Sequence, residues 1–581
     1  FVYDDLKDYD KALGFSFKAQ AIRKSLFGEM HPQMAESDII IASIYYNLKN
    51  YSAAIDHLER GISIFKHHKI DKGPVLAELN NNAGEVTMKL GKYETACQYF
   101  QNGMDANVVS YDDAYAGDVK YPKEFFRSSL LLRSLNGKGN SMMEMSKLKN
   151  NRTQLLESSV LNYEVADRII ELQKKSLLDQ NDKVEFADLS HLIYEGAINA
   201  CFLMHEETGE GKWLEKAFYF LERSKAGVLA ESLFSMNAKS FGRIPDGLLS
   251  FERKIKSEKS AYQTKILEAR ASGDTSGIRS MTDALFMLSN QADSLERVFE
   301  KDYPEYHTLK YTNSSIDLNH IQENLNTGEV LVEYFEGDSN IFIFAVTPGS
   351  FEVSSIPADS SYHMNLKKLK NCFARQGTNP YRPEIDFKEF SSSAQALYKL
   401  LIGVPLEKMR GSKSVRELII IPDGQLWYIP FDVLLKDNSA VSEGNYASLN
   451  YLIKDYSIVY GYSSVLSFGS IANKHTKASE DYLAFAPLYE NYPQDSIVQL
   501  ALGEFRDAVT PLKWNVREVE TLKEKFAGRY FFSRDATEGT FKKNAANYNV
   551  IHLAMHAVVD DRDPMNSKFI FYQDKDSMED G

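Results

Sequence analysis

Two histidines, His552 and His556, stand four residues apart near the end of the sequence. An imidazole exchanges protons near neutral pH and also binds metal ions. This spacing brings two side chains within about 6 Å on a helix, close enough to share a zinc ion, but to about 13 Å on a strand. Val550 and Ile551 favour a strand, and no glutamate follows His552 as a zinc-peptidase helix requires. We therefore expect no metal at this site, and we expect His552 to be packed within its strand.

The other potentially reactive side chains lack the neighbouring groups that catalysis or metal binding would require. The cysteines Cys97, Cys201 and Cys372 lie far apart and outside any Cys-x-x-Cys pair, so each is expected to be a small buried hydrophobe. Residues 461–465 are similar to a serine nucleophile elbow but lack its closing glycine, and we interpret them as structural. No glycine-rich phosphate loop follows a strand. The sequence therefore predicts no cofactor.

Length and charge exclude several classes of protein. The chain has 581 residues, of which 43% are hydrophobic, and this is enough for several folded domains. Its net charge of -14 argues against direct binding of nucleic acid, which requires a basic surface. No apolar run approaches the roughly 20 residues that cross a bilayer. Because Phe1 is not an initiator methionine, we expect the sequence to be a fragment.

The second half of the chain contains short apolar runs separated by turn residues, a pattern that predicts strands. Helical stretches such as residues 516–526 lie between some of these runs. This alternation predicts an α/β domain in which a sheet is flanked by helices and functional residues lie at the carboxyl ends of strands. The expected strands are residues 329–335, 341–346, 351–353, 417–421, 457–459, 482–486 and 549–554.

The middle of the chain is rich in Lys, Glu, Gln, Leu and Ala from residue 248 to about residue 300. Its strong breaker is the Ser-Gly-Asp sequence at 272–274. This composition predicts two long antiparallel helices. We interpret residues 236–305 as a helical hairpin spacer whose charged side chains form a solvated face.

The first hundred residues contain an internal repeat. Three tyrosines recur with a period of 42 residues, Tyr9, Tyr51 and Tyr93. A small residue follows at a constant distance in each copy, at Ala19, Gly61 and Gly103, and lets a paired helix approach closely. The unit resembles the tetratricopeptide repeat, in which helix pairs stack into a superhelix. We interpret residues 1–235 as such a superhelix, with divergent copies after residue 136, and the resemblance implies a protein partner or peptide substrate on its concave face.

Three phrases in the second half occur in the order typical of one family. They are Ile-Pro-Asp-Gly-Gln-Leu at 421–426, Tyr-Leu-Ile-Lys-Asp-Tyr at 451–456 and His-Leu-Ala-Met-His at 552–556. The set resembles the CHAT family of caspase-like cysteine peptidases of clan CD, which are fused to tetratricopeptide repeats. The resemblance covers residues 312–581, and Glu-Arg-Ser-Lys-Ala at 222–226 is also typical. It implies an α + α/β fold: an all-α superhelix, a helical hairpin and a caspase-like α/β sandwich.

The resemblance makes His556 the candidate general base and acid of a His/Cys dyad. In such a dyad the imidazole activates a thiol for attack on a peptide carbonyl and later protonates the leaving amine. The backbone N–H of Ala557 is the candidate oxyanion donor. The family generally has glycine at this position, and alanine tolerates a positive φ less readily. Met555 likewise stands where a hydroxyl residue is common.

The family's nucleophile lies in a Ser-Ala-Cys phrase at the end of the next strand, but no cysteine follows Cys372. We expect the natural polypeptide to continue with that strand, the cysteine and one or two helices, and we expect the present sequence alone to be inactive. Asp560 and Asp561 follow the histidine closely. They are candidates for receiving a basic substrate side chain, with a solvated loop as the alternative.

The sequence thus predicts a cysteine endopeptidase of bacterial type whose repeats recruit a protein partner or substrate. The alternative is an inactive pseudo-protease that serves as a scaffold in a larger complex, as the absent cysteine and Ala557 suggest. The resemblance favours a cytoplasmic protein. A periplasmic or membrane-associated protein, held through segments outside this sequence, is the alternative.

Overall fold

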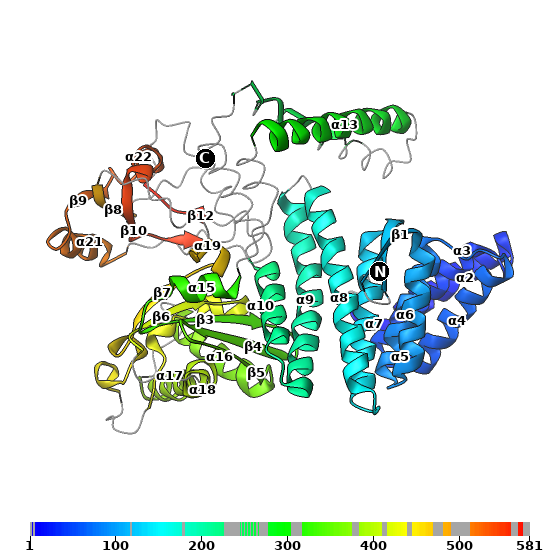
Figure 1. The fold of residues 1–581 in the computed structure, drawn as a ribbon, viewed down its shortest axis with the longest axis horizontal. Coiled ribbons are helices and arrows are strands. Elements are labelled where there is room, and N and C mark those ends of the chain that lie inside the picture. Colours follow the sequence, from blue (N-terminus) through cyan, green and yellow to red (C-terminus); the bar gives the residue numbers. More distant parts are fainter. Residues whose placement is uncertain are drawn as a thin grey trace. The chain divides into compact units, whose positions relative to one another are not determined.

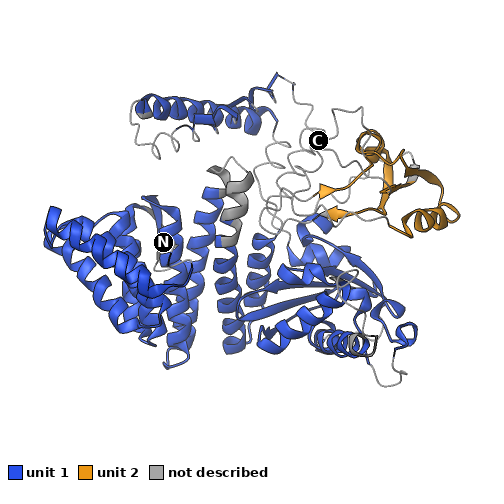
Figure 2. Ribbon diagram, turned by 180° about the vertical axis from the view of Figure 1, so that it is seen from behind, with its two compact units in different colours: residues 1–471 blue, residues 472–581 orange. Residues whose placement is uncertain are grey.

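The computed structural model describes residues 3, 6–116, 119–176, 180–225, 277–303, 317–374, 383–408, 415–437, 444–468, 480–489, 512–558 and 568–572, with scattered positions between 245 and 265. Its elements are labelled in Figure 1. The chain divides into two compact units, residues 1–471 and residues 472–581, coloured separately in Figure 2. Each unit is described by itself.

The first unit begins with an array of stacked helices (Figure 1). As the repeat predicts, Tyr9, Tyr51 and Tyr93 each begin a helix. The helices of the array are α2 (Tyr9–Phe27), α3 (Pro32–Asn47), α4 (Tyr51–His67), α5 (Pro74–Lys89), α6 (Tyr93–Asn107), α7 (Ser128–Ser146), α8 (Arg152–Ser176), α9 (Gln180–Thr208) and α10 (Lys212–Ser224).

Glycines set the spacing between the repeat helices. The buried ring of Phe100 on α6 contacts both Gly84 on α5 and Gly137 on α7. A Cβ atom at Gly84 would lie 2.7 Å from this ring, and one at Gly137 would lie closer still. Both approaches are too short for two carbon atoms, so glycine at these positions makes room for the ring of the neighbouring helix.

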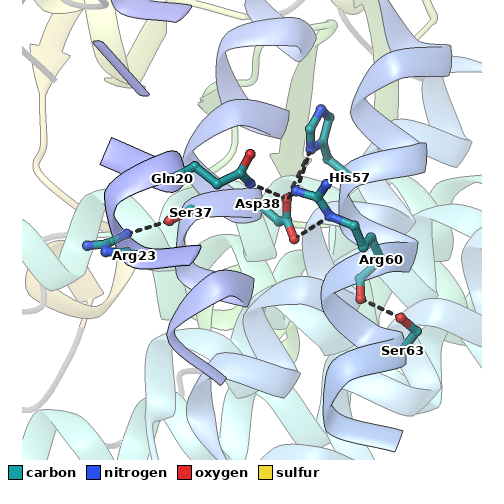
Figure 3. A network of polar contacts seen from close by, with 7 residues as sticks. All are labelled: Gln20, Arg23, Ser37, Asp38, His57, Arg60 and Ser63. Carbon is teal, nitrogen blue, oxygen red and sulfur yellow. Dashed lines mark hydrogen bonds and ion pairs between the residues drawn. The ribbon is translucent and has the colours of Figure 1, made fainter. Parts of the chain in front are cut away.

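A buried aspartate joins the first three helices (Figure 3). The carboxylate of Asp38 on α3 has no exposed surface and accepts a hydrogen bond from Gln20 of α2 at 2.9 Å. On the other side, Arg60 Nε lies 3.0 Å from Asp38 Oδ2, and His57 Nδ1 lies 3.0 Å from Oδ1. These contacts compensate the buried charge, which would otherwise be costly.

A β-hairpin interrupts the helical array, and the sequence pattern did not predict it. Its strands β1 (Val108–Ala116) and β2 (Val119–Phe125) are antiparallel. The base of the hairpin is closed by Asn107, whose side-chain amide donates to the carbonyl of Arg127 at 2.7 Å and accepts from its N–H at 3.1 Å. The buried amide thus holds the ends of α6 and α7 at the two feet of the hairpin.

The first unit also contains a five-stranded sheet of order β5-β4-β3-β6-β7. β4 runs antiparallel to β3 and β5, whereas β3, β6 and β7 are mutually parallel. All five strands are predicted from the sequence to within a few residues. They are β3 (Glu329–Glu336), β4 (Asn340–Thr347), β5 (Ser350–Pro357), β6 (Glu417–Ile421) and β7 (Ser457–Tyr460).

Each face of this sheet is covered by a different pair of helices. On one face, Phe342 and Phe344 of β4 belong to the same core as α9 and α10. On the other face, Val330 and Val332 of β3 pack with α16 (Ser360–Ala374) and α17 (Pro383–Tyr398). The last repeat helices therefore pack directly on the sheet, and the two share one hydrophobic core.

The expected hairpin spacer is partly described. Within its expected range lies α13 (Ile278–Asp302), whose Leu295 and Phe299 pack against Ile255. The breaker at 272–274 lies outside the described residues.

The second unit contains a parallel sheet of order β10-β8-β9, with β8 (Glu480–Pro487), β9 (Gly528–Ser533) and β10 (Tyr548–Leu553). α21 (Asn515–Lys523) packs on one face through Val519, and α22 (Glu538–Asn544) packs on the other through Phe541. The sequence predicts β8 and β10 but not β9. The strands predicted in the second half of the chain thus belong to two sheets, one in each unit, because strand patterns carry no information on which strands pair.

Candidate active site

His556 lies three residues beyond the end of β10, where the chain leaves the sheet. Its backbone is fixed on both sides. The His556 N–H donates to the hydroxyl oxygen of Tyr489 at 3.0 Å, and the His556 carbonyl accepts from the Ile570 N–H at 2.9 Å. The Tyr489 hydroxyl in turn donates to the Ile570 carbonyl at 2.7 Å. One buried tyrosine therefore joins the segment after β8, the histidine segment and the segment near residue 570.

The imidazole of His556 packs edge-on against the same tyrosine. The two ring centroids are 4.7 Å apart, with an angle of 63° between the rings. His556 is half-buried and Tyr489 is buried. The ring is thus positioned by a rigid neighbour at the carboxyl end of a parallel strand, where functional side chains gather in α/β sheets.

Ala557 begins the short strand β11 (Ala557–Val558), which pairs with β12 (Lys568–Phe569). Among the described residues, positive φ angles occur at several other positions but not at Ala557. Alanine is therefore not strained in this conformation, although the family generally has glycine. Asp560 and Asp561 lie outside the described residues.

His552 has surroundings that differ from the expectation. Its side chain is partly exposed and not packed inside the sheet, and its Nε2 lies 2.7 Å from a carboxylate oxygen of Glu518 on α21. The exposed carboxylate and the ring together form a polar contact on the α21 face of the sheet. No group of three or more histidine, cysteine or acidic side chains suited to a metal ion occurs within the described part of the chain.

β10 lies at the border of its sheet. It pairs with β8 on one side, and no described strand pairs with its other side. Val550 and Ile551 on this strand are 47% and 40% exposed. Aliphatic side chains are usually covered on a strand of a parallel sheet, so this edge has the properties of a surface to which a further strand is added.

The three cysteines all lie on helices of the first unit. Cys97 is half-buried on α6, Cys201 is buried on α9, and Cys372 is half-buried on α16. Burial raises the pKa of the Cys97 and Cys201 thiols. A cysteine nucleophile needs a lowered thiol pKa, so these two have the opposite property.

A second polar cluster, which sequence reasoning missed, lies where α10 meets the carboxyl ends of β3 and β6. The Glu222 carboxylate accepts hydrogen bonds from the N–H groups of Ser464 and Val465, at 3.1 and 2.9 Å. The Ser464 hydroxyl donates to Glu333 Oε2 at 2.7 Å. The other oxygen of Glu333, Oε1, is buried without a hydrogen-bond partner in the described structure.

Lys225 completes this cluster from the end of α10. Its ammonium donates to the Tyr334 and Pro422 carbonyls at 2.5 and 3.1 Å and lies 3.2 Å from Asp423 Oδ1. Glu222 and Lys225 both belong to the Glu-Arg-Ser-Lys-Ala sequence. This motif therefore attaches the last repeat helix to the loop after β6 through Lys225 and to the segment after β7 through Glu222.

Ionisation of Glu333 is unfavourable in this setting. Burial, followed by the neighbouring Glu222 carboxylate, raises the pKa of Glu333 well above its ordinary value, and nearby Lys225 opposes the shift. A signal for this site exists in the sequence: Glu333 interrupts a strand of otherwise apolar residues. An acidic residue at a buried strand position requires partners from elsewhere in the fold.

No described helix is long and apolar enough to cross a bilayer. Two family models match the chain: residues 391–581 match the CHAT domain, and residues 39–68, from the middle of α3 to the end of α4, match the tetratricopeptide repeat. No curated protein was found that matches the chain. β3 precedes the CHAT match but pairs with β6 inside it. The chain thus combines a tetratricopeptide repeat with a CHAT domain, the architecture of TPR-CHAT proteins.

Proposed function

We propose that this chain is the repeat-bearing part of a caspase-like cysteine endopeptidase in which His556 is the general base and acid. The observation that carries the proposal is the position of His556 just past a parallel strand, with its backbone hydrogen-bonded on both sides. A fixed backbone keeps the imidazole in one place relative to a neighbouring nucleophile.

The proposed reaction assigns each proton. The His556 imidazole takes the proton of a cysteine thiol, and the thiolate forms a bond to the carbonyl carbon of the scissile peptide. The Ala557 N–H donates to the oxygen that becomes negative in the tetrahedral intermediate. The imidazolium then gives its proton to the leaving amine as the C–N bond breaks, and water hydrolyses the thioester.

The cysteine of this dyad is not among the residues of this sequence. The proposal places it on a strand that pairs with the open side of β10, next to Val550 and Ile551. A parallel strand in that position would bring its carboxyl end close to the carboxyl end of β10, and therefore close to His556.

In the same proposal, the concave face of the repeats binds a protein partner or substrate. Stacked helical repeats present such a face for extended ligands. Binding there raises the local concentration of the substrate at the catalytic domain. Asp560 is the candidate acceptor of a basic substrate side chain, and a change of cleavage preference in Asp560→Asn tests that assignment.

The test uses the natural full-length polypeptide, a His556→Ala variant and a His552→Ala control. Each is incubated with candidate partner proteins, and their cleavage is followed by mass spectrometry. We expect His556→Ala to abolish cleavage and His552→Ala to retain it, because His552 contacts Glu518 and has no role in the dyad. Equal cleavage by wild-type and His556→Ala would refute the proteolytic role.

A scaffold without catalytic activity is the second candidate. It is favoured by one observation, that residues 391–581, which match the CHAT domain, contain no cysteine. The sequence of the natural polypeptide distinguishes the two candidates. A Ser-Ala-Cys phrase there favours the peptidase, and its replacement by another sequence favours the scaffold.

A further inference from the structure

A cavity of about 360 Å³ opens at the carboxyl ends of β6 and β7 in the first unit. Both strands are parallel, so the loop after β6 and the end of β7 meet at the same edge of the sheet. The residues that line the cavity and matter to its chemistry are Pro422, Trp427, Tyr428, Pro430, Asp432 and Tyr460.

Aromatic rings form much of the wall. Trp427, Tyr428 and Tyr460 are 42%, 44% and 41% exposed, which is unusual for large rings gathered at one place. Trp427 stacks on Tyr462 with the ring centroids 5.3 Å apart. The ring of Tyr460 is fixed by its hydroxyl, which accepts from the Phe431 N–H at 2.8 Å. Rings held in this way lose little conformational entropy when a ligand binds.

The carboxylate of Asp432 lies in the same wall. Asp432 accepts a hydrogen bond from the Tyr460 hydroxyl at 2.6 Å. Among the described residues, no lysine, arginine or histidine forms an ion pair with Asp432. Burial, together with this carboxylate, raises the pKa of Tyr460, so its hydroxyl stays protonated and keeps donating to Asp432.

The protein already uses one of these rings as a cation site. The ammonium of Lys370 on α16 lies 4.2 Å from the centroid of the Tyr428 ring. This is within the range of a cation–π interaction. Lys370 is not among the residues that line the cavity.

We infer that the cavity binds the side chain of an arginine in an extended segment of a partner protein. The planar guanidinium stacks on the exposed ring of Trp427 and donates hydrogen bonds to the Asp432 carboxylate, a combination that suits arginine better than lysine. The aromatic and proline residues alone would also suit a proline-rich segment, but Asp432, which forms no ion pair with a described residue, favours a cation. This inference does not depend on His556 or on proteolysis.

The test measures binding of a short alanine- and glycine-based peptide with one central arginine to the full chain by titration calorimetry. A second peptide carries citrulline, which has nearly the same shape but no charge, and a third is proline-rich. We expect the arginine peptide to bind about ten-fold or more tightly than the citrulline peptide, and we expect added salt to weaken its binding.

Two variants locate the site. Trp427→Leu and Asp432→Asn should each weaken binding of the arginine peptide about five-fold or more. The controls Trp514→Leu and Asp338→Asn remove an exposed tryptophan and an exposed aspartate elsewhere, and they should leave binding unchanged. Asparagine still accepts from Tyr460, so Asp432→Asn preserves the local fold.

Four results would overturn the inference: no binding of the arginine peptide, equal binding of the citrulline peptide, tighter binding of the proline-rich peptide, or unchanged binding in both site variants. None of these results bears on cleavage by the dyad.

Discussion

At the scale of single residues, Glu333 should make the stability of the protein depend on pH. Its pKa is raised above the ordinary value of 4.5 by burial and by Glu222. Between the unfolded and the folded pKa, the folded chain binds a proton that the unfolded chain releases, so this contribution to stability is present at low pH and is lost as the pH rises. Glu333→Gln keeps an acceptor for Ser464 and stays neutral at every pH.

We therefore expect Glu333→Gln to match the wild type near pH 5 and to exceed its free energy of unfolding by about 1–3 kcal/mol at pH 8. Urea titrations of both proteins at the two pH values check this. The control Glu352→Gln changes a partly exposed carboxylate on β5 and should not alter the pH dependence. A Glu333→Gln variant that is less stable than the wild type at pH 8 would contradict the assignment.

A second residue-scale prediction concerns Tyr489. Tyr489→Phe removes the hydroxyl that accepts from the His556 N–H and donates to the Ile570 carbonyl. We expect a loss of about 1–3 kcal/mol in the local opening free energy, because a buried carbonyl is left without its donor. Hydrogen exchange measures this as faster exchange of the His556 amide. Tyr530→Phe is the matched control, since its hydroxyl donates to an exposed carbonyl at Phe526; a similar change in both variants would argue against a positioning role for Tyr489.

At the scale of elements, replacing two helical glycines by alanine should have opposite effects on stability. A Cβ at Gly14 on α2 would have no side chain or neighbouring element within 4 Å, whereas a Cβ at Gly137 on α7 would overlap the Phe100 ring. Gly14→Ala should stabilise the protein by up to about 1 kcal/mol through helix propensity. Gly137→Ala should destabilise it by about 1–2 kcal/mol, because the cost of overpacking against Phe100 exceeds the gain in helix propensity. Thermal unfolding of the two variants checks the prediction, and stabilisation by both would show that α6 and α7 are packed less closely.

The sequence predicts those elements that have a strong local pattern. The repeat spacing places the starts of α2, α4 and α6, and continuous apolar runs place β3 to β8 and β10. β1 and β2 are missed because Asp112 and Asp113 interrupt any apolar alternation, and β9 is missed because it is a short run directly after a helix. Short segments of this kind become strands through pairing with a neighbour, which local sequence does not encode.

The candidate site, too, could be predicted only in part. His556 follows from a motif whose residues are adjacent in the chain. Its supports, Tyr489 and Ile570, and the partners of Glu333 come from distant segments, so no spacing rule brings them together. Glu222 and Ser464 meet across 242 positions of sequence.

At the scale of the first unit, the shared hydrophobic core predicts that a destabilising substitution on a repeat helix also destabilises the sheet. Phe218 on α10 packs against Phe344 of β4 and Phe351 of β5, with ring centroids 6.0 and 5.9 Å apart. Phe218→Ala should cost about 3–5 kcal/mol and accelerate amide exchange in both α9 and β4. Phe286→Ala removes an exposed ring from α13 and should do neither. Faster exchange confined to α9 and α10 would contradict a common core.

The direct packing of α9 and α10 on the sheet also has a mechanical consequence. A helical superhelix changes its curvature by small rotations between neighbouring repeats. In this protein the last pair cannot rotate without sliding over β4 and pulling on the attachment made by Glu222 and Lys225. We therefore expect any change of curvature near the end of the array to strain the strand ends to which Glu222 and Lys225 are attached.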